Sequence, residues 1–401
     1  MRHLSFIAAC LLSTLALAQD VALRVATFNV EDIRTSDLAD AANPRLRALA
    51  EVIQRLRPNV ILLNEIAYDM PGAPGWREGA KPGQNAARFV ELYLSVPQAD
   101  GLIPIRYTPF MAPVNSGVAS GFDLDKDGTV TTSYPNPPPS GPDGSPRPQT
   151  AEGQAYGNDC WGFGTFPGQY GMALLVGEPL EIVAAEVRTF QRLPWDYVPG
   201  AFLPTDEHGK PWYTPEQLAL FRLSSKSHWD VPVKVPNGAV VHFLCSHPTP
   251  PAFDGPEMRN RKRNHDEIRF WADYVSNAPY IVDDTGREGG LTPYVNFVIL
   301  GDLNADPEKG NSWKNPIRTA LGSIGRLVLP AAPRADLDVP GLSLTDTAMF
   351  KMRVDYVLPC KELAVRASGV YRAVPAARAE SRVFPSDHFP VWVDMVVPQP
   401  R

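Results

Sequence analysis

Short apolar runs recur along the chain, and turn-forming residues separate them. Runs of this length are typical of strands in a sheet that is covered on both faces. The strongest examples are LRVATFNV at 23–30 and VILLNE at 60–65. We predict strands at residues 23–30, 60–65, 172–176, 180–187, 240–246, 295–301, 353–358 and 391–397.

Helical signals lie between these runs. Asn43 followed by Pro44 is a capping residue before a first-turn proline, which predicts a helix over 44–56. Further helices are predicted near 86–96 and, more strongly, over 259–275. Strands interspersed with helices indicate a large mixed α/β architecture rather than separate all-α and all-β domains.

Two long stretches interrupt this pattern. Residues 113–168 are rich in Pro, Gly, Asn and Ser, and residues 188–215 place aromatic residues such as Trp195 and Tyr213 among prolines. Loops of this length in a compact domain are usually functional or disordered, and the aromatic residues argue against disorder in the second. We interpret both as insertions in a single domain that spans residues 19–401.

The composition narrows the class of protein. Of the 401 residues, 44% are hydrophobic and 20% charged, as in ordinary globular proteins. The 42 prolines exclude a helical bundle. A net charge of −6 argues against a general nucleic-acid coat protein. It leaves a nuclease open, because there only the field at the cleft matters.

The first 18 residues have the features of a signal peptide. A short polar start with Arg2 precedes the apolar run 4–17, and Ala16-Leu17-Ala18 offers a cleavage site. Lipoprotein processing at Cys10 is the less favoured alternative, since only six residues separate the apolar start from that cysteine. The run is shorter than the roughly 20 residues that span a bilayer. We expect a secreted or periplasmic protein with no transmembrane segment.

Three cysteines remain after the signal peptide: Cys160, Cys245 and Cys360. An odd number excludes a complete disulfide framework, although one pair stays open. Cys245 lies in an apolar run, where we expect a buried free thiol. No Cys-x-x-Cys pair is present, which makes a structural zinc site improbable.

Polar side chains follow the predicted buried strands at their carboxyl ends, where open α/β sheets usually place their sites. Each one alone fits a helix cap or a turn. Together they offer carboxylate and amide oxygens, which suit Mg²⁺ or Mn²⁺, and two histidines for proton transfer. The set predicts metal-assisted phosphoryl chemistry, and its members are Asn29, Glu31, Glu65, His247, Asp302, Asn304, Asp355, Asp387 and His388.

In this order, the motifs TFN29, LNE65, SH247, GD302-L-N304, VD355-Y and SD387-H388 resemble those of the endonuclease/exonuclease/phosphatase superfamily, the pancreatic-deoxyribonuclease-like hydrolases. The resemblance covers nearly the whole chain after the signal peptide. It implies a four-layer sandwich, in which two mixed β-sheets pack together and helices flank them.

The resemblance also implies roles for the residues. Glu65 would be the main ligand of Mg²⁺ or Mn²⁺, with Asn29, Glu31 and Asp387 in or beside the metal shell. Glu31 departs from the residue found in several relatives. Asp302 and Asn304 would position the attacking water and the phosphate. Asp355 would orient His388, and His247 would bind a phosphate oxygen or protonate the leaving group.

Two weaker signals lie outside these motifs. Asp123, Asp125 and Asp127 match the start of a calcium loop with glycine at its sixth position, but the twelfth position is tyrosine. We expect Ca²⁺ there, and an acidic turn is the alternative. Basic residues on the helix after His247 would form a phosphate-attracting wall or a solvated helix face; they are Arg259, Arg261 and Arg263, with Lys262 and Arg269.

The sequence thus predicts a secreted, divalent-metal-dependent phosphoesterase, most readily a phosphodiesterase or nuclease. The alternatives are a lipid or sugar-phosphate phosphodiesterase or phosphatase, and an inactive calcium-stabilised binding protein. The substrate would be a nucleic acid, a phospholipid or a small phosphodiester. We expect the two insertions to determine which one.

Overall fold

The computed structural model describes residues 19–400 apart from 328, 330, 331 and 379–382. The predicted signal peptide, including Cys10, lies outside the described residues. No helix in the described part of the chain is both long and apolar enough to cross a membrane. Cys160, Cys245 and Cys360 are buried free thiols, so no disulfide joins them.

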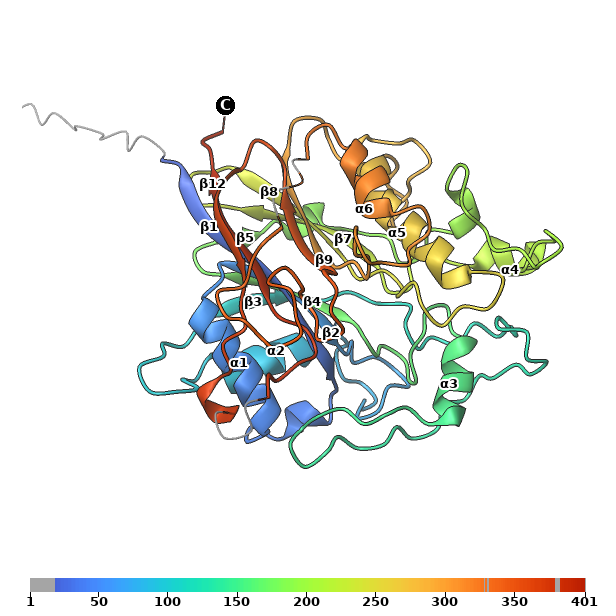
Figure 1. Cartoon of the computed structure of the whole chain (residues 1–401), viewed down its shortest axis with the longest axis horizontal. Coiled ribbons are helices and arrows are strands. Elements are labelled where there is room, and N and C mark those ends of the chain that lie inside the picture. Colours follow the sequence, from blue (N-terminus) through green and yellow to red (C-terminus); the bar gives the residue numbers. More distant parts are fainter. Residues whose placement is uncertain (1–18, 328, 330–331, 379–382, 401) are drawn as a thin grey trace, which may run out of the picture.

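Two mixed β-sheets form the centre of the molecule (Figure 1). The first has the order β11 (Ala364–Val370), β12 (Val391–Val397), β1 (Val21–Ile33), β2 (Val60–Ile66), β4 (Met172–Gly177) and β3 (Tyr107–Phe110). The second has the order β10 (Asp355–Pro359), β9 (Asn296–Asp302), β8 (Val240–Ser246), β7 (His228–Lys234) and β5 (Glu181–Ile182), and β6 (Arg188–Thr189) also pairs with β7. Each sheet contains one parallel pair, β1 with β2 and β8 with β9.

Helices cover the outer faces of the sheets (Figure 1). On the side of the first sheet lie α1 (Pro44–Leu56) and α2 (Asn85–Phe89), which continues as a π-helix over Val90–Leu94. On the side of the second lie α5 (Arg259–Val275) and α6 (Pro316–Thr319). Trp271 ties α5 to the sheet by donating a hydrogen bond to Ser246 Oγ at 2.9 Å. The predicted four-layer sandwich is confirmed.

Gly301 lies where the two sheets approach each other. A Cβ atom on this residue would lie 1.9 Å from the carbonyl oxygen of Ser246 and 3.5 Å from Leu62 of the first sheet. Its φ of +144° also disfavours side chains. Glycine is therefore required directly before Asp302, the last residue of β9.

Several element predictions match the structure, and others need correction. The helices at 44–56 and 259–275 and the strands at 240–246 and 391–397 have the predicted bounds. The predicted strand 180–187 is wrong: only β5 is strand there, followed by a 3-10 turn at Ala184–Glu186. The side chains of that turn are not buried, so an apolar run did not mean a buried strand there.

The two long stretches predicted as insertions are packed against the rest of the chain. The first contains α3 (Ala151–Asn158) and has buried residues such as Asn115 and Tyr156. The second contains β6 and a 3-10 turn at Trp195–Tyr197, and α4 (Pro215–Leu220) follows it. Trp195 and Tyr213 are buried. Both stretches therefore have defined positions in the fold.

Candidate active site

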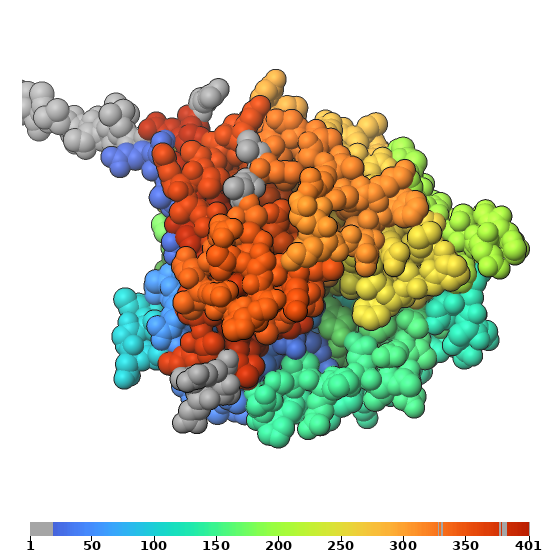
Figure 2. Space-filling view, viewed as in Figure 1, coloured from blue at the N-terminus to red at the C-terminus, as the bar shows by residue number. Residues whose placement is uncertain are grey.

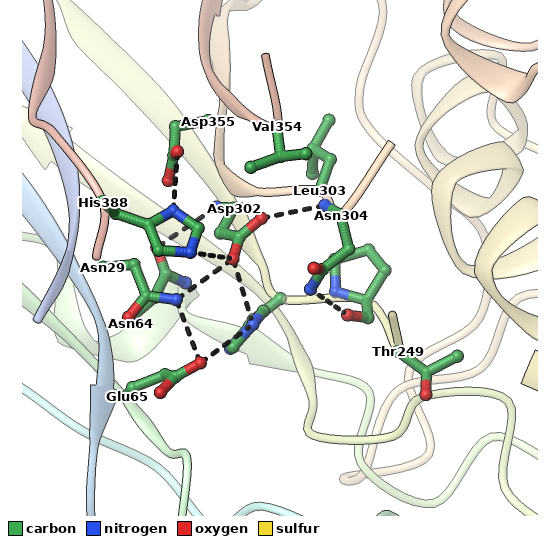
Figure 3. A network of polar contacts seen from close by, with 12 residues as sticks. Asn29, Asn64, Glu65, Thr249, Asp302, Leu303, Asn304, Val354, Asp355 and His388 are labelled. Carbon is green, nitrogen blue, oxygen red and sulfur yellow. Dashed lines mark hydrogen bonds and ion pairs between the residues drawn. The ribbon is translucent and has the colours of Figure 1, made fainter. Parts of the chain in front are cut away.

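Strand ends from both sheets meet at one place (Figure 3). The Asn29 amide, on β1, donates hydrogen bonds to Glu65 Oε1 at 3.0 Å and to Asp302 Oδ2 at 3.1 Å. Asn64 Oδ1, on β2, accepts a hydrogen bond from the backbone N–H of Asp302 at 3.2 Å. Glu65 ends the apolar part of β2 and Asp302 ends β9, so these contacts join the carboxyl ends of the two sheets.

Asp355 and His388 form a buried pair in this cluster (Figure 3). His388 Nδ1 lies 2.9 Å from Asp355 Oδ2, which also accepts a hydrogen bond from the Thr347 hydroxyl at 2.7 Å. The other ring nitrogen, Nε2, lies 3.8 Å from Asp302 Oδ2. Burial disfavours the charged ring, but Asp355 and Asp302 outweigh it and raise the pKa of His388 well above its usual value.

His247 faces the same carboxylates from the loop after β8. Its Nε2 atom lies 3.5 Å from Asp302 Oδ2 and 3.9 Å from Glu65 Oε1. Burial and the positive charge of Lys226 lower the pKa of His247 to about 4, so the ring is neutral at neutral pH. Its buried Nδ1 atom has no hydrogen-bond partner among the described residues.

Asn304 completes the polar group around Asp302. Its backbone N–H donates to Asp302 Oδ1 at 2.9 Å, and its side-chain amide donates to the carbonyl of Pro248 at 3.1 Å. Burial opposes ionisation of Asp302, but His388 and His247 prevail and lower its pKa. Asp302 is therefore ionised, and each of its two carboxylate oxygens accepts a hydrogen bond.

Glu65, Glu31 and Asp387 bring negative charge together at the cavity. Burial, with the charge of Asp387, raises the pKa of Glu65 to about 8 and that of Glu31 to about 7. Such a group of carboxylates fits a hard divalent cation, which would favour their ionised forms. Glu65 and Asp387 line the main cavity, whereas Glu31 lines a smaller recess on the other side of Asp387.

The predicted ligand Asn29 has a different orientation from the carboxylates. Its nitrogen faces Glu65 and Asp302, while its oxygen accepts a hydrogen bond from the backbone N–H of Glu31 at 3.0 Å. In this arrangement Asn29 thus orients the carboxylates and does not add its own oxygen to theirs as a further ligand for a cation. Glu31 in turn accepts a hydrogen bond from the backbone N–H of Asp387 at 3.2 Å.

Part of the cluster lines one part of a cavity of about 590 Å³, namely Glu65, His247, Asp302, Asn304, Asp387 and His388. In Figure 2 the hollow lies between the orange-red loops near residue 350, the yellow start of α5 and the green insertion near residue 150. Both insertions contribute to its walls, the first through Gln149 and Asn158 and the second through Trp195 and Tyr213. The cavity therefore joins the predicted catalytic residues to the predicted specificity loops.

Lys226 is a residue of this cavity that the sequence did not indicate. It is only 5% exposed and lies two residues before β7, which was not predicted as a strand. Burial lowers the pKa of its ammonium group, while Glu267, Glu65 and Asp302 oppose this shift. Lys226 lies at the amino end of β7, so the pattern of polar residues at the carboxyl ends of strands does not include it. Thr347 was missed as well, because no periodic pattern surrounds it.

The predicted arginine wall is only partly at the cavity. Arg259 and Arg263 line it, but Arg261 does not and lies 3.7 Å from Asp254. Arg263 is buried and donates hydrogen bonds to the carbonyls of Leu223 and Trp161, so the chain itself uses its guanidinium. Of the three arginines, Arg259 therefore best fits the predicted role of attracting a phosphate.

The predicted calcium loop forms a different set from the one expected. Asp123, Asp125 and Asp159 place carboxylate oxygens within 4.8 Å of one another. Asp127 is outside this set and accepts a hydrogen bond from the backbone N–H of Thr129. Asp159 already accepts backbone N–H groups at 2.8 and 2.7 Å. Calcium here stays a prediction.

Comparison with known proteins identifies the family. The model of the Endonuclease/Exonuclease/phosphatase family matches residues 26–388. An endonuclease/exonuclease/phosphatase from Beutenbergia cavernae DSM 12333 is 20% identical, with a TM-score of 0.51 over 94% of this chain and 72% of that chain. The catalytic domain of human Nocturnin is 14% identical, with a TM-score of 0.43 over 93% of each chain. No curated protein sequence matches significantly.

The matched region begins in β1 and ends at His388, so it contains every residue of the strand-end cluster. At 20% identity the Beutenbergia cavernae structure supports the fold alone. The family match, by contrast, spans most of the sequence. The chain therefore belongs to the endonuclease/exonuclease/phosphatase family.

Proposed function

We propose that this protein is a divalent-metal-dependent phosphoesterase that hydrolyses a phosphodiester. The observation that carries the proposal is the meeting of Glu65 and Asp387 with Asp302, His247 and His388 at one end of the cavity. Family membership supports metal-dependent phosphoester hydrolysis in general. The alternative of an inactive binding protein does not explain why buried, charged groups are kept together there.

Glu65 and Asp387 would hold the cation, and Mg²⁺ or Mn²⁺ suits these oxygen ligands. When bound, the cation supplies positive charge that offsets the phosphate and the carboxylates. Lys226 would add a second positive charge, since the nearby carboxylates of Glu267, Glu65 and Asp302 favour its ammonium form against the effect of burial. The cavity can therefore accept an anion despite its carboxylates.

The side chains divide the reaction between them. Asp302, kept ionised, orients the attacking water by accepting a hydrogen bond from it. His388, protonated because of Asp355, stabilises negative charge on the phosphoryl group. Neutral His247 can donate a hydrogen bond to a phosphate oxygen, but at neutral pH it has no acidic proton for the leaving group.

The net reaction is a hydrolysis. The oxygen of water forms a bond to phosphorus, and the bond between phosphorus and the leaving oxygen breaks. One proton of the water ends on the leaving oxygen. No oxidant, reductant or second substrate is needed.

Glu65→Gln tests the proposal directly. The variant should lose about a hundredfold or more of the hydrolysis of bis(p-nitrophenyl) phosphate in Mg²⁺ or Mn²⁺, because it removes the central anionic ligand. Glu181→Gln, which changes an exposed carboxylate of β5, serves as the matched control and should keep wild-type turnover. EDTA should abolish activity of both the wild type and the control. Wild-type turnover by Glu65→Gln in metal-depleted buffer would refute the proposal.

Export remains part of the proposal, and it rests on residues 1–18 of the sequence alone. Fractionation of cells that express the full chain should recover a protein beginning near Gln19 outside the cytoplasm. A cytoplasmic protein that keeps residues 1–18 would remove export from the proposal without affecting the chemistry.

A further inference from the structure

Part of the cavity is not needed for breaking the P–O bond. Beyond the carboxylates and histidines, Trp195, Tyr213 and Phe221 form a buried aromatic wall. The rings of Tyr213 and Phe221 stack with centroids 4.5 Å apart, and Trp195 lies 5.8 Å from Phe221. This wall gives the cavity an apolar side next to its charged end.

Two further aromatic residues at the cavity are exposed. Phe253 is 91% exposed, on the loop between β8 and α5, and Phe350 is 48% exposed. The Phe350 ring packs edge-on against His388, with centroids 5.3 Å apart. Large apolar side chains left in water beside a cavity commonly mark a binding site. Phe350 would contact a group attached to a phosphate beside His388.

The charge around the cavity does not suit a polymer backbone. Among the described residues, the basic side chains that line it are Lys226, Arg259 and Arg263. Lys226 and Arg263 are buried, and Arg259 donates a hydrogen bond to the carbonyl of Leu124 at 3.1 Å. Duplex nucleic acids are usually held by many Lys and Arg contacts to successive phosphates. One buried ammonium is enough for a single phosphate.

Resting on the proposed phosphodiesterase activity, we propose that the substrate is a small phosphodiester with a flat aromatic group, and that this group binds between Phe350, Phe253 and the wall formed by Trp195, Tyr213 and Phe221. The cavity volume of about 590 Å³ falls in the range of roughly 300–1,000 Å³ found for small-molecule sites. Stacked aromatic contacts favour a ring over an alkyl group of the same charge. Phe350 and Phe253 are thus specificity residues.

The test uses two diesters that release the same p-nitrophenolate. One carries a phenyl group and the other a methyl group on the remaining ester oxygen. The ratio of kcat/KM, phenyl over methyl, should fall at least about tenfold in Phe350→Leu and in Phe253→Ala. Tyr294→Ala is the matched control, because Tyr294 is 90% exposed and has a positive φ like Phe253 but does not line the cavity. Its ratio should equal that of the wild type.

A binding measurement separates this inference from the proposed function. Calorimetry with phenyl phosphate and methyl phosphate should show tighter binding of phenyl phosphate, and Phe253→Ala should remove the difference. Hydrolysis of both diesters with a ratio that neither phenylalanine variant changes would overturn the inference and leave the function standing. Preferential binding without any hydrolysis would overturn the function and support the aromatic site. Plasmid cleavage with a higher kcat/KM per phosphodiester, unaffected by the variants, would show a polymer substrate and overturn the inference.

Discussion

At the scale of single residues, Asp355 is, with Asp302, what keeps His388 charged. Asp355 is buried, and its Oδ2 atom bonds to both the His388 ring and the Thr347 hydroxyl. A buried carboxylate without such partners would be costly. The pair therefore stabilises its own ionised form, and each member depends on the other.

A double-mutant cycle tests this dependence. Asp355→Asn should lower the pKa of His388, so the limb of the pH–rate profile that belongs to this ring should move to lower pH. Asp355→Asn and His388→Ala should each reduce turnover by about tenfold or more. Their combined loss should be far smaller than the product of the single losses. Strictly multiplicative losses, measured at saturating metal, would show that the two side chains do not work together.

Most residues of the active site could be predicted from the sequence for a physical reason. Asn29, Glu65 and Asp302 each interrupt an apolar run at its carboxyl end, and strand ends converge in space. Lys226 and Phe350 carry no such signal. Lys226 precedes β7, and Pro232 within β7 hides the strand pattern from the sequence. Phe350 lies where no element was predicted. Their positions depend on tertiary packing, which single-sequence patterns do not contain.

At the scale of elements, strands with a continuous apolar run were predictable, whereas strands without one, such as the buried β7 and the exposed β11, were not. The strands β8 and β12 are flanked on both sides by other strands, and their bounds were predicted correctly. The edge strand β11 is largely exposed and lacks an apolar run, so no pattern marked it. The predicted helix 86–96 changes to a π-helix after Phe89, a change of hydrogen bonding that periodicity does not specify.

Gly301→Ala tests how tightly β9 and its neighbour β8 approach each other. The added Cβ would collide with the Ser246 carbonyl, and we expect the free energy of unfolding to fall by roughly 2 kcal/mol or more. Urea unfolding followed by tryptophan fluorescence measures the loss. The control is Gly325→Ala, because no atom lies within 4 Å of its added Cβ. Equal stability of the two variants would contradict the close approach.

At the scale of the whole molecule, the negative charge of the clustered carboxylates Glu31, Glu65 and Asp387 links the stability of the fold to metal binding. A cation that binds only the folded chain raises its free energy of unfolding, by about 2.7 kcal/mol at a hundred times Kd. Protons compete for the same oxygens, since burial and Asp387 raise the pKa of Glu31 to about 7 and that of Glu65 to about 8.

The increase in Tm caused by Mg²⁺ or Mn²⁺ should therefore be small at pH 6 and grow as the pH rises through 7 to 8.5. Differential scanning calorimetry measures this dependence. Glu65→Gln should show a reduced increase at pH 8.5, while Glu181→Gln should behave like the wild type. An increase in Tm that is the same at pH 6 and pH 8.5 would place the cation away from these carboxylates.

The amide of Asn29 links Glu65 of one sheet to Asp302 of the other. A chain that has formed either sheet alone holds only half of the reactive groups. During refolding, catalysis should consequently appear only when the sheets dock, after the signal of β-structure has developed. On gentle heating it should vanish before that signal does. The onset of hydrolysis would then report the time at which the two sheets dock.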